Sequence, residues 1–428
     1  MKVLIVHARY RQPSGEEVVV AIQSSVLVSL GHEVVLFERR NDEVGGSGAL
    51  GQAREAVATV WSEARRREVG AAIAADRPDV VHVHNTFPSL STSIYAAANA
   101  AGVPVVQHLH NARLVCANPW MFRDHEPCTD CVGRRVPWPA VVHRCYHDSV
   151  THSGVAAAVQ LTNHALGISA RRVDLFLPVS DWLGTLVVES GAVPAAKVLV
   201  CHSGLDPDPG ARPVPTTARP DGGYAVFVGR LAVEKGVDTL LAAAALVPEL
   251  PLKIAGDGPD RGAIAAAVAA AGLAQVELLG HVDRTRVLEL LRGARVSVTP
   301  SNMGDSLPMS AVEGAACGVP AIGSRAGGIP EIIVDGVTGF LVPPGNPTAL
   351  ARALRTAATD PVRMAAMGQA ARRHFEKRFA ARRMGERLLE AYEVATANAA
   401  AAGRRRGVGP VGRLRRMTPT DAGHRNGE

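Results

Sequence analysis

The amino-acid sequence predicts an α/β protein with two Rossmann-like domains, each built around a parallel sheet. Short runs rich in β-branched residues alternate with Ala- and Leu-rich helical stretches twice along the 428 residues. A chain of this length needs at least two compact cores, because single cores stop growing at about 250–300 residues. Residues 206–223 are dense in Pro and Gly, as expected for an interdomain linker, and they separate the two sets of strands.

The strand candidates form two groups on either side of this linker. The first group covers residues 3–6, 34–37, 80–83, 105–107, 175–179 and 198–200. The second group covers residues 225–228, 252–255, 276–279, 295–299 and 319–322. Because helical stretches separate the strands within each group, each group predicts one parallel sheet.

The domain boundaries follow from these groups. The first domain is expected over residues 1–205, with a cysteine-containing insertion at about 111–150, and the second over residues 224–380. An amphipathic stretch at 381–398 predicts a C-terminal helix, for which a return to the first domain is one arrangement. Residues 399–428 are expected to form a basic, disordered tail.

Charge is concentrated at the C-terminus. The formal net charge is +6, and the last thirty residues hold seven arginines against Asp421 and Glu428, so +5 of it lies there. The remaining chain is nearly neutral and aromatic residues make up only 4%, which argues against a nucleic-acid partner. A solvated terminus is the simplest interpretation of the tail, and contact with an anionic membrane is the alternative.

The N-terminus carries no recognisable targeting signal. The apolar run from Val3 to Val6 is ended by His7 and Arg9, long before a signal-peptide core of about 7–15 residues is complete. No run of ~18 uncharged apolar residues occurs. These features predict a cytoplasmic protein, with peripheral contact at the inner face of the plasma membrane as the alternative, and they predict reduced cysteines.

The strongest candidate site follows the fourth strand of the second group. Asp305 lies in the loop after this strand, at the carboxyl edge where open α/β sheets bind ligands. Pro308 suits a first helical turn, whose free amides attract anionic or hydroxyl-rich ligands. Glu313 follows about one and a half turns into the helix, so both carboxylates can face one polyol. The alternative is that Asp305 caps the helix and Glu313 is a surface residue.

A second candidate segment follows the first strand of the same group. Gly229, Arg230 and Lys235 stand just beyond residues 225–228, again at the carboxyl edge of the expected sheet. Arg230 can bind two phosphate oxygens and Lys235 adds a point charge, so together they can neutralise a diphosphate. A solvated Arg/Lys pair is the alternative.

Five segments of the second domain, in this order, resemble the family 4 (group 1) retaining glycosyltransferases of the GT-B fold. They are Gly229-Arg230 with Lys235-Gly236, Ala255-Gly-Asp-Gly258-Pro, Gly280, the stretch from Asp305 to Glu313, and Thr338-Gly-Phe-Leu-Val342. The resemblance covers most of residues 1–397. It implies two domains that face a cleft, with the acceptor on the side of the first domain and the donor nucleotide sugar on the second.

The resemblance assigns roles residue by residue. It implies that Arg230 and Lys235 bind the donor diphosphate, that Glu313 binds the ribose and that Asp305 contacts the transferred sugar. The glycines Gly229 and Gly258 belong to the donor motifs, and the amides of Leu307 and Met309 remain available to sugar hydroxyls. Asp305 departs from the family pattern, which has glutamate here, and Ser306-Leu307 replaces Gly-Phe. The identity of the donor sugar is therefore less well defined than donor binding.

The first domain offers fewer candidates. Gln12-Pro-Ser14-Gly15-Glu16-Glu17 follows the first strand and resembles the glycine-rich loop of the family, with Ser14 in place of a glycine. His84 and His110 both end strands at the same edge, where a structural role is common. The family places a histidine near the donor sugar after the fourth strand, and His110 matches that position best.

Four cysteines occupy the insertion with the spacing C-x11-C-x2-C-x13-C: Cys116, Cys128, Cys131 and Cys145. The tight pair has the spacing of zinc ligands, and a structural zinc site is one interpretation. Buried reduced cysteines and redox pairing are the alternatives. Cys201 and Cys317 stand singly among apolar residues, which predicts packing.

Together these features predict transfer of a hexose from a UDP- or GDP-sugar to an acceptor hydroxyl, with retention implied by the family. The acceptor is expected to be a glycan or a lipid-linked glycan, in glycan, glycolipid or cell-surface polysaccharide synthesis. No catalytic cofactor is expected, since Arg230 and Lys235 serve the leaving group and no Asp-x-Asp motif ends a strand. The alternatives are a nucleotide-sugar-binding protein with little turnover and an epimerase or phosphorylase-like enzyme. The absence of a complete G-x-G-x-x-G after either first strand disfavours a nicotinamide oxidoreductase.

Overall fold

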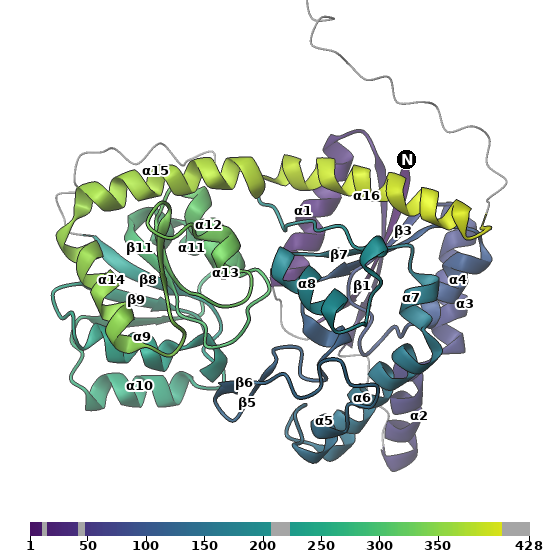
Figure 1. The fold of residues 1–428 in the computed structure, drawn as a ribbon, viewed down its shortest axis with the longest axis horizontal. Helices are drawn as coiled ribbons and strands as arrows, with labels where there is room; N and C mark the ends of the chain where they lie inside the picture. Colours follow the sequence, from purple (N-terminus) through teal and green to yellow (C-terminus); the bar gives the residue numbers. More distant parts are fainter. Residues whose placement is uncertain (11–14, 42–47, 207–222, 405–428) are drawn as a thin grey trace, which may run out of the picture.

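The computed structural model describes residues 1–10, 15–41, 48–206 and 223–404. They form two α/β domains side by side, each around its own parallel sheet (Figure 1). The expected linker falls almost entirely outside the described residues, and so do Gln12 to Ser14 and all of the basic tail after Arg404. None of the helices in the described ranges has the length and apolar character of a membrane span.

The first sheet has the strand order β2-β1-β3-β4-β7, and every neighbouring pair is parallel. Its elements are β1 (Lys2–Arg9), α1 (Gly15–Ser29), β2 (Glu33–Arg40), α2 (Gly48–Val60), α3 (Glu63–Asp76), β3 (Val80–Val83), α4 (Ser93–Ala100), β4 (Val105–Leu109), β7 (Leu175–Pro178) and α8 (Asp181–Glu189). β1, β3 and β4 are fully or almost fully buried, as β-branched runs covered by helices on both faces should be. The strand expected at residues 198–200 contributes only one bridge, between Val198 and Phe176.

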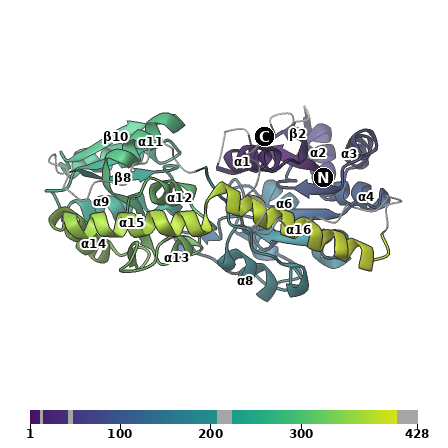
Figure 2. The same cartoon turned by 90° about the horizontal axis from the view of Figure 1, so that it is seen from above.

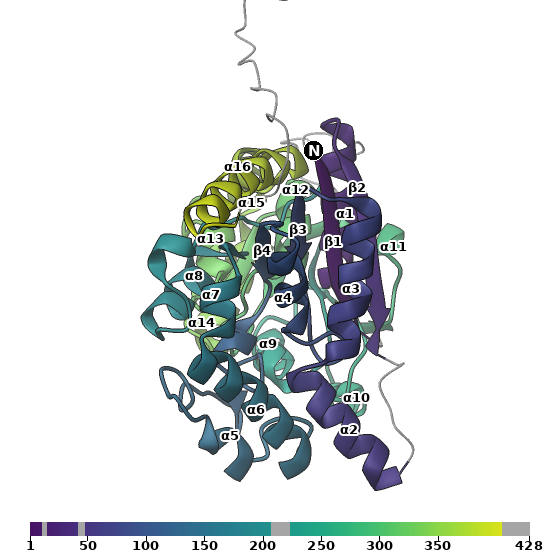
Figure 3. The ribbon, with the colours of Figure 1, turned by 90° about the vertical axis from the view of Figure 1, so that its right-hand side faces the viewer.

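The insertion between β4 and β7 contains little regular structure in its first half. It consists of the 3₁₀ turn η2 (Ala112–Leu114), the short antiparallel pair β5 (Phe122–Arg123) and β6 (Glu126–Pro127), and the helices α5 (Trp138–Val142), α6 (Val150–Leu166) and α7 (Ile168–Arg172). Seen from the side of the first domain, α5 and α6 gather with α2 at the end opposite α16 (Figure 3). The insertion leaves β4 at its carboxyl end, so it stands at the ligand-binding edge of the first sheet.

The second sheet has the order β10-β9-β8-β11-β12-β13 and is also parallel throughout. Its elements are β8 (Tyr224–Val228), the 3₁₀ turn η4 (Val233–Lys235), α9 (Val237–Ala244), β9 (Leu252–Ala255), α10 (Arg261–Ala270), β10 (Val276–Gly280), α11 (Arg284–Gly293), β11 (Ala294–Thr299), α12 (Met309–Ala316), β12 (Ala321–Ser324), α13 (Ile329–Ile332), β13 (Gly339–Val342) and α14 (Pro347–Thr359). β13 is an edge strand beyond the five that the sequence predicts.

The C-terminal helix returns to the first domain. α15 (Pro361–Arg378) packs on the second domain, and α16 (Ala381–Ala401) continues along the first, as Figure 2 shows from above. Tyr392 and Met384 of α16 are buried against Val3 and Ile5 of β1. The apolar face of α16 thereby completes the core of the first domain, whose first strand lies almost four hundred residues earlier in the chain.

The two domains also contact each other directly. The carboxylate of Glu331 on α13 accepts hydrogen bonds from the amides of Asp181 and Trp182 at 2.9 Å each, so it caps α8 of the other domain. A third bond joins Glu331 Oε2 to His202 Nε2 at 2.8 Å. The Trp182 ring lies against Gly304, where a Cβ would be 2.5 Å from the ring atom Cζ2. Only glycine permits this approach between α8 and the loop after β11.

Candidate active site

Two loops of the second domain meet through an ion pair. Nζ of Lys235, at the end of η4, donates to Oδ2 of Asp305 at 2.5 Å. The hydroxyl of Ser301 lies 3.3 Å from the same oxygen. β8 and β11 are neighbours in the sheet, so the loops at their carboxyl ends are adjacent. The structure thus brings together two of the residues that the sequence singled out.

Arg230 lies in the same loop as Lys235 and has two partners. Its guanidinium forms an ion pair with Glu234, and its Cζ lies 4.3 Å from the ring centroid of Trp120. Trp120 belongs to the insertion of the first domain, so this stacking crosses between domains. The sequence placed the insertion in the domain expected to face the acceptor, but it gave no signal for the contact with Arg230.

Asp305 does not cap the helix that follows it. α12 begins at Met309, with Pro308 at the N-cap position and no side-chain capping bond. The carboxylate of Asp305 points instead to Lys235 and Ser301. This geometry favours the interpretation of Asp305 as a site residue over the capping alternative.

Glu313 faces a different cation. Its Oε1 lies 3.5 Å from Nη1 of Arg284, the first residue of α11. Burial raises the pKa of Glu313, and the charge of Arg284 opposes that rise. The side chain of Glu313 is only 13% exposed, so it is not the surface residue of the alternative interpretation. Arg284 was not among the predicted site residues, because charged residues are common at the starts of surface helices and one of them alone gives no signal.

The glycines of the donor motifs allow two loops to touch. Gly229 follows β8 directly and donates its amide to the carbonyl of Ala255, which ends β9. A Cβ on Gly258 would lie 2.3 Å from the carbonyl oxygen of Leu231. Gly258 is therefore required by close backbone packing, whether or not it also contacts a ligand.

Gly15 places the first domain next to the donor loop. It begins α1, and a Cβ on it would lie 3.5 Å from Cγ of Met309 at the start of α12. Leu307 is buried beside Met309 in the same core cluster. The N-termini of α1 and α12 thus face each other across the domain boundary.

Two acidic residues in the first turn of α1 lie near a buried histidine. The hydroxyl of Tyr10 donates to Oε2 of Glu16 at 3.2 Å, and Nδ1 of His7 lies 3.8 Å from Oε1 of Glu16. Burial raises the pKa of Glu16 to about 7, although His7 lowers it. The sequence signal was an acidic first turn, which is common at helix starts and so did not single out Glu16.

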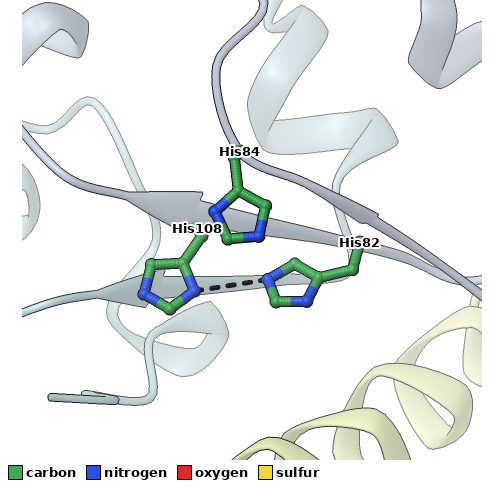
Figure 4. Close-up of side chains that lie close together, drawn as sticks. All are labelled: His82, His84 and His108. Atoms are coloured by element: carbon green, nitrogen blue, oxygen red, sulfur yellow. Dashed lines mark hydrogen bonds between the residues drawn. The ribbon is translucent and has the colours of Figure 1, made fainter. Parts of the chain in front are cut away.

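A column of histidines fills the space beneath these groups. His82 on β3 and His84, the residue after β3, stack on His108 of β4, with the three ring centroids 4.6–5.4 Å apart (Figure 4). Their ligand atoms lie within 4.8 Å of one another, but the rings stack nearly parallel, at 8–28°. Imidazole lone pairs lie in the ring plane, so parallel rings do not direct them at a single ion. Instead, His82 Nδ1 lies 2.8 Å from the Tyr392 hydroxyl.

His110 stands at the end of this column, just beyond β4. Its Nε2 lies 2.8 Å from Nδ1 of His84, and its ring stacks on His108 at 4.6 Å. Burial lowers the pKa of His110 well below the ordinary value, as it does for His84 and His108. His110 is therefore held as a neutral imidazole at the carboxyl edge of the first sheet.

The six cysteines all lie in described parts of the chain, and no disulfide joins any of them. Cys116, Cys128, Cys131 and Cys145 line one small cavity in the insertion. Cys201 and Cys317 are buried in other parts of the chain, among the core side chains of α16 and α11.

Comparison with known proteins gives a consistent picture. Residues 14–204 match the family model described as "Glycosyl transferase 4-like domain", and residues 214–374 match "Glycosyl transferases group 1". The chain is 27% identical over 375 residues to a glycogen synthase of Mycobacterium tuberculosis, covering 86% of this chain and 79% of that protein. It is 36% identical over 166 residues to a D-inositol 3-phosphate glycosyltransferase of Streptomyces avermitilis, about a third of each chain (35%).

Solved structures share the arrangement of both domains. HepE of Anabaena in complex with UDP and glucose has a TM-score of 0.62 at 18% identity, covering 91% of this chain and 98% of that one. Sucrose-phosphate synthase from Thermosynechococcus elongatus has a TM-score of 0.66 at 18% identity, covering 92% and 99%. Likeness at this level of identity shows a common fold.

Proposed function

The chain belongs to the group 1 glycosyltransferases of the GT-B fold, which transfer a sugar from a nucleotide sugar, and we propose that it transfers a hexose to an acceptor hydroxyl with retention. The pairing of Lys235 with Asp305 carries the proposal. This ion pair places the residue assigned to the diphosphate beside the residue assigned to the sugar. A nucleotide sugar that contacts both loops needs these two side chains close together.

The cations Arg230 and Lys235 stabilise the leaving diphosphate. Each is paired with a carboxylate of this chain, Glu234 and Asp305. A bound diphosphate competes for the same cations, and it gains negative charge as the glycosidic bond breaks. Fixed cations at that position stabilise the transition state more than the ground state, which raises turnover. A divalent metal is not needed for this step.

The remaining donor contacts follow from the elements around this pair. Glu313 lies farther along α12 and binds the ribose, while Asp305 contacts the sugar. The amides of Leu307 and Met309 at the start of α12 serve sugar hydroxyls or phosphate oxygens. Gly15, Gly229 and Gly258 allow the backbone to approach the donor. HepE, whose structures contain UDP, supports a UDP-sugar as donor, with a GDP-sugar as the alternative.

His110 acts next to the sugar from the first domain. Its neutral ring can donate or accept one hydrogen bond at a hydroxyl without bringing a charge near a positively charged sugar. No protein nucleophile is assigned, and an oxygen of the leaving phosphate is the base that takes the acceptor proton. The acceptor is a glycan or lipid-linked glycan, presented on the side of the insertion.

A donor screen tests the proposal. UDP- and GDP-hexoses are added to the full chain, thermal stabilisation is measured, and release of nucleoside diphosphate is followed with and without acceptor sugars. A ligand at a hundred times its dissociation constant should add about 2.7 kcal/mol of stability. Stabilisation with turnover supports a transferase. Tight binding with no turnover on any acceptor, and no hydrolysis, would instead identify a binding protein.

A further inference from the structure

The first half of the insertion has few features that would hold it in one shape. Between residues 115 and 137 the regular structure is limited to β5 and β6, which are two residues long each. Met121, Asp124 and His125 all have positive φ, at 50°, 52° and 65°. Non-glycine residues rarely adopt this conformation, and it persists only where the surroundings impose it. Val115, Cys116 and Met121 anchor one side of the segment in the main core, whereas the other side rests on a small cluster that includes Phe87, Ala117 and Ala140.

Four thiols converge inside this segment. Cys116 follows η2, Cys128 follows β6, Cys131 lies in the next turn and Cys145 follows α5, and all four line one small cavity. Arg123 lines the same cavity, and its Nη1 is buried without a hydrogen-bond partner. Its Nε and Nη2 pair with Asp124 and Asp130, so the buried Nη1–H is the donor that still needs an acceptor to offset its lost hydration.

We propose that Cys116, Cys128, Cys131 and Cys145 bind one structural Zn²⁺, which fixes the loop that places Trp120 over Arg230. Zinc takes four cysteine thiolates in a tetrahedron with Zn–S distances of about 2.3 Å, which puts the sulfur atoms ~3.8 Å apart. The metal-compatible groups with ligand atoms within 4.8 Å of one another do not include these cysteines in the described chain, so binding requires their side chains to turn inward. A zinc with four thiolates carries a net charge of −2; at the cavity wall Arg123, whose guanidinium also pairs with Asp124 and Asp130, offers its buried Nη1–H to a thiolate sulfur.

The zinc ligands are coupled to Trp120 through the backbone. The amide of Cys128 donates to the carbonyl of Met121 at 2.8 Å, directly after Trp120. On the other side, the amide of Ala112 donates to the carbonyl of Pro119 at 3.3 Å. The amide of Cys116 donates in turn to the carbonyl of Ala112 at 2.9 Å, so Cys128 is linked directly, and Cys116 through Ala112, to the short loop that carries the indole. Because that indole stacks on Arg230 of the other domain, the metal also sets one wall of the donor site.

Metal analysis of the full chain tests the proposal. Protein prepared without added zinc should contain about one zinc per chain, and the mercurial reagent that titrates its thiols should release that zinc. Cys128→Ser and Cys131→Ser should lose most of the zinc. Cys201→Ser and Cys317→Ser are matched controls, since they remove buried thiols outside the cavity, and they should keep it.

Thiol titration in denaturant separates zinc from disulfide pairing and needs no variant that folds, while the zinc content separates zinc from buried reduced cysteines. A chelator-treated wild-type chain should show six thiols, and two disulfides would show two. Wild-type protein that holds no zinc as prepared and binds none when zinc is added would overturn the proposal. Equal zinc content in wild type and Cys128→Ser would overturn it as well. Zinc binding here requires no sugar donor, so failure of the glycosyltransferase assay leaves this test unaffected.

Discussion

The ammonium group of Lys235 lies 2.5 Å from a carboxylate oxygen of Asp305, which joins two loops seventy residues apart in the sequence. Both side chains are largely buried, Lys235 at 22% and Asp305 at 13% exposed. Together they support the proposal that the donor binds at the carboxyl edge of β8 and β11. Arg230, the glycines of the donor motifs and the start of α12 surround the same edge, so most of the assigned donor groups come from one side of one sheet.

Arg230→Ala should lower turnover far more than it weakens binding of the nucleotide sugar. The charge of Arg230 stabilises the transition state most strongly, because the leaving diphosphate gains negative charge there. Removing this charge should therefore lower kcat on the order of 10²-fold or more. Steady-state kinetics with saturating donor measures this. Arg382→Ala is the matched control, because Arg382 is 83% exposed on α16 and pairs with Glu386 of the same helix. Equal turnover in Arg230→Ala and wild type would remove Arg230 from the mechanism.

Asp305→Glu restores the usual acid of the family and tests what the shorter side chain does. If Asp305 fits the sugar of this enzyme, the extra methylene crowds that sugar, and affinity for the sugar nucleotide should fall while affinity for the bare nucleoside diphosphate is kept. Titration of both ligands side by side decides this. Equal losses for the two ligands would show that Asp305 acts through Lys235 and the diphosphate, and not at the sugar.

Trp120→Ala should reduce turnover by about two- to fivefold, because an exposed cation–π contact contributes about 0.5–1 kcal/mol. Without the indole, Arg230 keeps its ion pair with Glu234 but loses the stacking contact, so its guanidinium samples more positions. Trp138→Ala is a suitable control, since Trp138 is a half-exposed tryptophan of the same insertion that stacks on Arg134 at 5.6 Å, away from the donor loops. A drop of the same size in both variants would mean that the insertion is merely destabilised.

The histidine column should make the protein less stable as the pH falls below about 6.5. Burial lowers the pKa of His82 to about 3, whereas the unfolded chain titrates near 6.5. Between these two values the unfolded state binds the proton and the folded state does not, so stability is lost as the pH drops through this window. Urea unfolding at pH 8, 6, 5 and 4 measures the trend.

His82→Gln provides the control for that trend, because glutamine can still reach the Tyr392 hydroxyl but does not titrate. The difference in unfolding free energy between wild type and this variant should shrink or change sign as the pH falls. Glu16, whose pKa is raised to about 7, contributes the opposite trend and is present in both proteins. A difference that is constant from pH 8 to pH 4 would show that His82 takes up its proton equally in both states.

Much of this architecture was predictable from periodicity. Five strands of each sheet and the amphipathic stretch of α16 were visible, because buried parallel strands are continuous apolar runs bounded by Gly and Pro. The prediction of a strand at residues 198–200 was wrong, because this segment forms only a single β-bridge, from Val198 to Phe176. A β-branched run does not show whether the neighbouring strand is long enough to pair with it. β13 (Gly339–Val342) was not predicted, because this strand is only four residues long and begins with glycine.

The donor site was predictable in parts only. Lys235 and Asp305 could be placed at strand ends from the sequence, and adjacent strands in a parallel sheet bring such ends together. The stacking of Trp120 on Arg230 could not be predicted from the sequence, since it joins an irregular loop of one domain to a turn of the other. Likewise, the Glu331 cap on α8 depends on how the two domains dock, which local patterns do not encode.

Proton NMR of the transfer reaction tests both retention and the role of Lys235. Wild-type protein and Lys235→Ala are each given an α-linked UDP- or GDP-hexose, and the configuration of the product and the rate of transfer are measured. The proposed mechanism predicts release of the nucleoside diphosphate, a product with the α configuration of the donor, and a rate at least about a hundredfold lower in the variant. A β-linked product, or a rate that is unchanged in Lys235→Ala, would contradict the account.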